Sequence, residues 1–94
     1  MISPVSVGDL VISIAGRDKG KIFLVIQSEN GKSLIVDGKI RKVNKPKIKN
    51  NKHLKKLFLA NFNELAERIK RGESVGNQRV YRTIKAEKEK LQED

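Results

Sequence analysis

The sequence predicts a mainly β protein, folded as a small barrel, with an α-helical appendage at its C-terminus. Short apolar runs alternate with polar residues over the first 40 positions, and Asn-Gly and Asp-Gly pairs separate these runs. After position 57 the apolar residues recur at helical spacing instead. With 94 residues and 37% hydrophobic content, the chain suits one small domain with an extension, and a large catalytic cleft is not expected.

Three short strands are expected, at residues 10–15, 21–28 and 33–37. Asn30-Gly31 suits the positive backbone angles of a tight hairpin, and Asp37-Gly38 offers the same turn chemistry before a further extended segment at residues 39–44. Such a meander buries its apolar side chains economically by curling into a barrel, which also limits exposed sheet edges. The expected inward-facing residues are Leu10, Ile12, Ile14, Ile22, Leu24, Ile26, Leu34 and Val36. Residues 22–26 are apolar on both faces, so this run leaves the inward face undecided.

Two helices are expected after the strands, as a hairpin joined by Gly-Glu-Ser-Val-Gly. Asn61 or Asn63 is the candidate N-cap of the first helix and Gly72 its stop, while Asn77 is the candidate cap of the second. The apolar stripes of the two helices are Phe62, Leu65, Ala66 and Ile69, and Val80, Tyr81, Ile84 and Leu91. These stripes either pack against each other and the barrel or form a binding site for a partner protein.

The formal charge of +10 is concentrated in one segment. Residues 1–38 carry four basic and four acidic groups, and residues 57–94 carry eight and seven, whereas residues 39–56 carry nine basic groups and no acidic one. This basic tract repels itself and is best tolerated beside a polyanion, which for a basic protein usually means nucleic acid; a solvated lysine face is the alternative. The chain therefore divides into a barrel with the basic tract, residues 1–58, and a helical extension, residues 59–94.

Several classes of function find no support in the sequence. The chain has no cysteine, and its one histidine, His53, lacks metal-ligand companions, so we expect neither a metal site nor a thiol nucleophile. A nucleotide-binding P-loop needs four residues between its glycines, whereas Gly16 and Gly20 enclose three. No catalytic trio or carboxylate pair is recognisable, and we expect no enzymatic activity and no cofactor. No export signal or membrane span is visible, and a reducing cytoplasm is the expected location.

The stretch from Gly8 to Ile26 resembles the KOW motif of ribosomal proteins and transcription elongation factors. The matching positions are Gly8, Asp9, Val11, Ile14, Gly16, Asp18, Lys19, Gly20 and Lys21. Together with residues 33–57, which end in a basic run containing His53-Leu54, the chain is similar to the archaeal and eukaryotic-type large-subunit ribosomal protein fourteen family. It also resembles short bacterial relatives described as KOW-domain RNA-binding proteins. The resemblance implies an SH3-like barrel and ribosomal RNA binding, and it does not extend to the helical extension.

Charge and resemblance together predict an RNA-binding surface with no catalytic and no metal-binding residues. The expected RNA contacts are Arg17, Lys19 and Lys21 from the loop and Arg41, Lys42, Lys45, Lys47, Lys49 and Lys52 from the basic tract. Most are lysines, which as point charges hold phosphates without reading bases. Aromatic residues make up only 4% of the chain, and Phe23, Phe58 and Phe62 sit in apolar contexts that favour core packing over base stacking; Tyr81 is open to either role.

The expected partners are RNA, above all ribosomal RNA of the large subunit, and ribosomal proteins, with no membrane and no small-molecule substrate. Two alternatives belong to other classes. One is a protein-interaction adaptor that uses the C-terminal helices, and the other is a KOW-type transcription-associated factor that binds DNA or RNA. A permanent ribosome component, an assembly factor and a regulator are equally compatible with the sequence.

Overall fold

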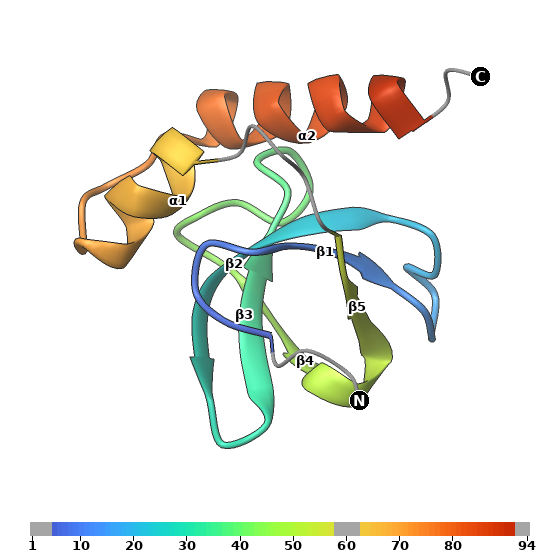
Figure 1. Ribbon diagram of the computed structural model, residues 1–94. Helices are drawn as coiled ribbons and strands as arrows, with labels where there is room; N and C mark the ends of the chain where they lie inside the picture. The colour runs from blue at the N-terminus through green and yellow to red at the C-terminus, as the bar shows by residue number, and fades with distance from the viewer. Residues whose placement is uncertain (1–4, 58–62, 92–94) are drawn as a thin grey trace.

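The computed structural model describes residues 5–57 and 63–91 as an antiparallel sheet with two helices packed against it (Figure 1). The elements are β1 (Leu10–Ser13), β2 (Ile22–Glu29), β3 (Lys32–Val36), β4 (Lys47–Asn50), the single-turn 3-10 helix η1 (Asn51–His53), β5 (Leu54–Lys56), α1 (Asn63–Lys70) and α2 (Asn77–Leu91). The sheet has five strands in the order β4-β3-β2-β1-β5. The prediction of a mainly β chain with a helical appendage is therefore confirmed.

The turn between β2 and β3 follows the sequence prediction. Asn30 and Gly31 both have positive φ, 52° and 79°, and the flanking residues Glu29 and Lys32 pair across the hairpin. Asparagine and glycine adopt this left-handed geometry at low cost, so the pair sets the register of the hairpin locally. Position 30 is the one non-glycine residue with positive φ in the part of the chain that the structure describes.

The prediction of an extended segment at residues 39–44 is wrong. The carboxylate Oδ1 of Asp37 accepts backbone N–H groups of Lys39, Ile40 and Arg41 at 2.9, 3.0 and 2.8 Å, and the chain closes into a loop. A side chain that takes up three consecutive amides competes with strand pairing, because those amides are no longer available to a neighbouring strand. The next strand, β4, begins only at Lys47.

Alternating residues of the strands build two hydrophobic clusters on opposite faces of the sheet. The helix-side cluster comprises Leu10, Ile22, Leu24 and Val36 with Leu65, Ile69, Val80 and Ile84 of the helices. The second cluster comprises Val11, Phe23, Val25, Ile35 and Leu54. The predicted inward set thus lies mainly on the face that the helices cover, and Phe23 packs in a core as expected. Ile14 is an error of that prediction: it follows the end of β1 and is 47% exposed.

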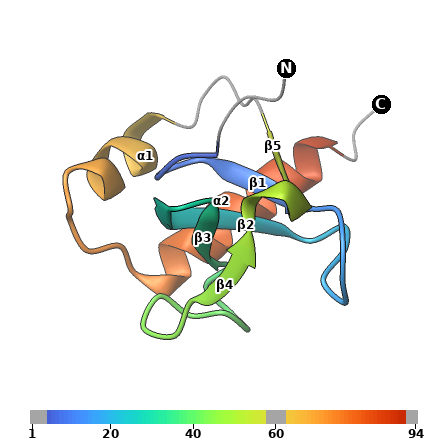
Figure 2. The ribbon, with the colours of Figure 1, turned by 90° about the horizontal axis from the view of Figure 1, so that it is seen from below.

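Both helices turn their apolar residues toward the sheet, and α2 runs behind the strands in Figure 2. Gly72 ends the first helix as predicted, with φ of 81° and backbone bonds from Gly72 N to Ile69 O and from Glu73 N to Arg68 O. Tyr81 departs from the predicted stripe, because it is not among the buried residues of α2.

None of the helices among residues 5–57 and 63–91 is long and apolar enough to cross a membrane.

The prediction that the Asn77 side chain caps the N-terminus of α2 is wrong. The residue begins α2, but its side-chain Oδ1 accepts the backbone N–H of Val43 at 2.7 Å and does not bond to its own helix. Asn63 is the first residue of α1. Asn61, Phe58 and Phe62, and the side chain of Leu91, lie outside the described part of the structure.

Candidate nucleic-acid interface

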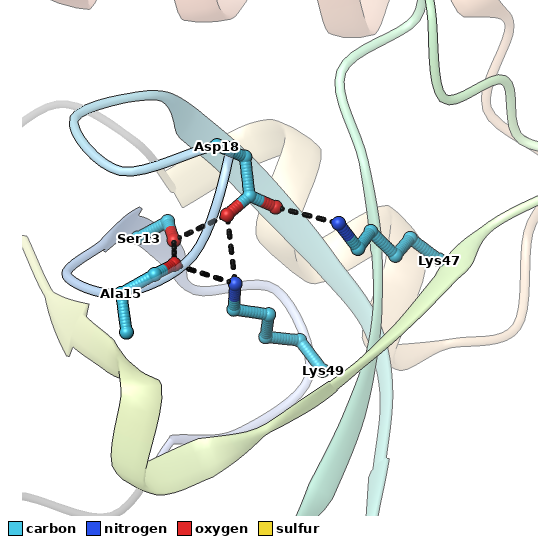
Figure 3. A network of polar contacts seen from close by, with 5 residues as sticks. All are labelled: Ser13, Ala15, Asp18, Lys47 and Lys49. Carbon is cyan, nitrogen blue, oxygen red and sulfur yellow. Dashed lines mark hydrogen bonds and ion pairs between the residues drawn. The ribbon is translucent and has the colours of Figure 1, made fainter.

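A buried aspartate organises the loop between β1 and β2 (Figure 3). Asp18 is 7% exposed, and its Oδ1 accepts hydrogen bonds from Ser13 Oγ and Lys49 Nζ, both at 2.7 Å. Its Oδ2 accepts a hydrogen bond from Lys47 Nζ at 2.9 Å. Lys49 Nζ also donates to the carbonyl oxygen of Ala15 at 2.8 Å. The loop is therefore tied to edge strand β4 by two ammonium groups.

The backbone of the loop makes room for these ammonium groups. Gly16 has φ of 84°, and a Cβ at this position would lie 3.3 Å from Lys49 Nζ. A side chain there would be strained by the backbone angle and would also crowd the ammonium. Ser13 O accepts Gly20 N at 2.8 Å, so the loop folds back directly onto the end of β1.

The same contacts determine the charge state of the aspartate. Burial alone would raise the pKa of the Asp18 carboxyl. Hydrogen bonds from Lys49, Lys47 and Ser13 outweigh burial and hold this pKa well below its ordinary range. The carboxylate is therefore ionised at neutral pH, and two lysines of the protein itself neutralise it.

The structure separates the predicted RNA contacts into two groups. Lys49 is buried, at 9% exposure, and Lys47 is partly buried, and the ammonium groups of both are bound to Asp18. The exposed residues of the predicted set are Arg17, Lys19, Lys21, Arg41, Lys42, Lys45 and Lys52. Lys49 consequently has the least surface to offer a phosphate, and its visible role is to hold the loop.

Residues from the loop and from the basic tract meet around one shallow depression of about 150 Å³. Four of its lining residues are predicted cations: Arg17 and Lys21 from the loop, and Arg41 and Lys47 from the tract. The lining also includes two carboxylates: Asp18, which the lysines neutralise, and Asp37, whose Oδ1 accepts three backbone amides, so the cations exceed the acids by four to two. The five remaining predicted cations do not line this depression: Lys19, Lys42 and Lys45 lie on the exposed loops, Lys49 is buried in β4, and Lys52 lies in η1.

Helix α2 holds the basic tract in place, a role that the sequence analysis did not identify. A Cβ at Gly38 would collide with the carbonyl oxygen of Asn77 and lie 2.8 Å from the backbone nitrogen of Tyr81, so the chain approaches the helix, directly before the tract begins, as closely as glycine permits. The bond from Val43 N to Asn77 Oδ1 fixes the other side of the same loop. In the sequence, Gly38 is the one sign of this close approach, and the pair Asp37-Gly38 by itself indicates only a turn.

The role of Asp18 as a partner of lysines was also missed. The sequence contained one signal for it, because residues 39–56 hold nine cations and no acid, so a buried lysine of this tract needs an acid from elsewhere in the chain. Among the residues that the structure describes, no group of histidine, aspartate and glutamate side chains could hold a metal ion.

Comparison with protein-family models and with curated proteins finds no match to this chain. The assignment of the interface therefore depends on its residues and their geometry.

Proposed function

We propose that the protein is a non-catalytic RNA-binding protein of the KOW type that binds ribosomal RNA of the large subunit. One observation carries the proposal: cations from two segments about 20 residues apart, Arg17 and Lys21 in the loop and Arg41 and Lys47 in the tract, line the same depression. Convergence of this kind makes a local basic surface, whereas a merely solvated lysine tract would spread its charge.

An SH3-like barrel is the proposed finer architecture. The second hydrophobic cluster supports it, because Val11, Ile35 and the edge-strand residue Leu54 pack together on the sheet face opposite the helices. Residues of a central strand and of an edge strand share one compact cluster most readily when the sheet curls around it.

The depression suits phosphates better than base edges. Its walls supply arginine and lysine, and the exposed residues Lys19, Lys42 and Lys45 extend the positive charge onto the adjoining loops. If about five phosphates are neutralised, the logarithm of affinity should fall against the logarithm of salt concentration with a slope of roughly −3.5 to −4.5. We therefore propose recognition of a folded RNA by shape and charge.

The test is crosslinking in living cells with sequencing of the RNA bound to the tagged protein. The informative variant is Arg17→Gln/Lys21→Gln/Arg41→Gln, which removes three exposed charges without touching the Asp18 contacts. The matched control is Lys32→Gln/Lys70→Gln/Arg82→Gln, which removes three exposed charges outside the loop, the tract and the depression.

A large-subunit ribosomal RNA peak that disappears in the first variant and persists in the control supports the proposal. Absence of an RNA peak, or equal loss in both variants, contradicts it. Affinities for duplex DNA and structured RNA at the same salt concentration distinguish this proposal from a transcription-associated factor. The adaptor alternative gains no support from the helices, since Leu65, Ile69, Val80 and Ile84 are already buried against the sheet.

A further inference from the structure

A second, larger hollow of about 480 Å³ lies between α2, the start of β2 and the loop that follows β3, next to the basic depression. Lys21, Asp37 and Ile40 line both hollows, so the two form one continuous surface. Its volume is in the range typical of sites for small organic groups. Helix α2 contributes half of its lining, including Tyr81 and Lys85, so residues far outside the KOW-like segment reach the proposed RNA surface.

The apolar part of the groove lining is partly exposed. Ile40 is 68% exposed and Tyr81 is 37% exposed, and both line the groove with the buried Ile84. Tyr81 is the exposed aromatic residue among those that the structure describes, since Phe23 is in the core. An exposed isoleucine and tyrosine that share one concave site offer a surface for a flat, partly apolar group.

Four lysines share the groove lining with these apolar residues. Lys21, Lys39, Lys85 and Lys88 line the groove, together with two carboxylates, Asp37 and Glu89. One oxygen of Asp37 already accepts three backbone amides, so this side chain organises the turn. The excess of cations favours an anionic occupant.

A lysine ammonium lies over the ring of Tyr81 in a cation–π contact. Lys39 Nζ lies 5.6 Å from the ring centroid. A cation over an exposed ring contributes less than a stacked nucleic-acid base does, so a base can take this position and leave the ammonium to a neighbouring phosphate.

We propose that this groove holds one unpaired nucleotide of the bound RNA. Its base lies against Tyr81 and Ile40, and its flanking phosphates contact Lys39 on one wall and Lys85 and Lys88 on the other. The proposal rests on the RNA-binding function proposed above and adds a preference to it: RNA with an unpaired nucleotide is bound more tightly than fully paired RNA. Helix α2 then acts both as a support for the basic tract and as part of the binding site.

The test compares two labelled RNA duplexes that are identical except for a single bulged 2-aminopurine nucleotide. Dissociation constants for both are measured by fluorescence anisotropy with the full chain. We expect the wild type to favour the bulged duplex by about tenfold, the size of one base–aromatic stack. Tyr81→Ala should abolish this preference and leave the affinity for the paired duplex within about twofold, whereas Tyr81→Phe should retain the preference because the stacking ring remains.

The ratio of the two affinities is unaffected by a partly unfolded variant, because misfolded protein lowers both values equally. The variant Arg17→Gln/Arg41→Gln, whose residues line the depression and not the groove, should weaken binding to both duplexes to a similar extent. Equal wild-type affinity for the two duplexes, or a preference that survives Tyr81→Ala, overturns the groove assignment while RNA binding itself stands. If the wild type binds neither duplex in a salt-dependent manner, the proposed function fails and the groove assignment fails with it.

Discussion

Two loops carry most of the proposed RNA-binding surface, and each is built around an aspartate that is stabilised in a different way. Asp18 is buried and accepts hydrogen bonds from side chains, two of which lie 29 and 31 residues away along the chain. Asp37 is only partly buried and accepts backbone amides within four residues of itself. The first loop is therefore stabilised by ion pairs with distant residues. The second is stabilised by hydrogen bonds between neighbouring residues and by its packing against α2.

The largest effect is expected from Asp18→Asn. This change leaves the ammonium of Lys49 buried without a countercharge, and breaking a buried ion pair in this way costs about 3–5 kcal/mol. The free energy of unfolding in urea should fall by that amount. Glu29→Gln, at an exposed hairpin position, is the control and should change it little. A loss below about 1 kcal/mol for Asp18→Asn, the range typical of exposed ion pairs, would show that the network is not buried in solution.

Gly38→Ala should have the next largest effect, because φ is 81° and the added methyl group meets α2. We expect a loss of about 2 kcal/mol in the free energy of unfolding, together with weaker RNA binding. The matched control is Gly31→Ala, at φ of 79° with nothing within 4 Å, for which only the backbone penalty of about 1 kcal/mol applies. Equal losses for the two variants would contradict the close packing of the tract on α2.

Acid should destabilise the protein through Asp18. Its pKa is lowered in the folded state, so its contribution is complete above the unfolded pKa of about 4 and is lost as the pH falls below that value. Between about pH 4 and pH 2 the unfolded state binds more protons at this residue, and the loss reaches at most about 1.4 kcal/mol for each pH unit. The free energy of unfolding, measured against pH, should fall more steeply for the wild type than for Asp18→Asn. Parallel curves would exclude Asp18 as the titrating group.

Asp37→Asn should have the smallest effect. The amide oxygen of asparagine can accept the same three backbone amides, and only the contribution of the charge is lost, so we expect about 1 kcal/mol or less. The free energies of unfolding of Asp37→Asn and Asp18→Asn, measured in urea under the same conditions, then show how much more the first loop depends on charge than the second. A loss for Asp37→Asn as large as that for Asp18→Asn would show that both loops depend on charge to the same degree.

Much of the fold and part of the site could be predicted from the sequence. The alternation of apolar residues locates β1, β2 and β3 to within two residues, and Asn30-Gly31 and Gly72 mark a hairpin turn and a helix end. The exposed cations of the predicted site, such as Arg17 and Arg41, could also be named. These features depend on interactions between residues close in the chain, which a sequence displays directly.

The features that the sequence left undecided or did not reveal have the opposite origin. Residues 22–26 are apolar on both faces, and the face that meets the helices depends on where Leu65 and Val80 dock. Lys49 looks like any other lysine of the tract, and only the approach of Asp18 from 31 positions away makes it a buried structural residue.

The sequence by itself therefore determined the first three strands, the hairpin turn, the helix end and the sign of the surface charge, because backbone preference and charge are properties of single residues and their neighbours. The tertiary structure alone decided that loop and tract share one depression, that α2 supports the tract through Gly38 and Asn77, and that Tyr81 lines a groove among lysines. These arrangements result from packing between segments distant in the chain, where the position of each side chain depends on how the whole chain folds.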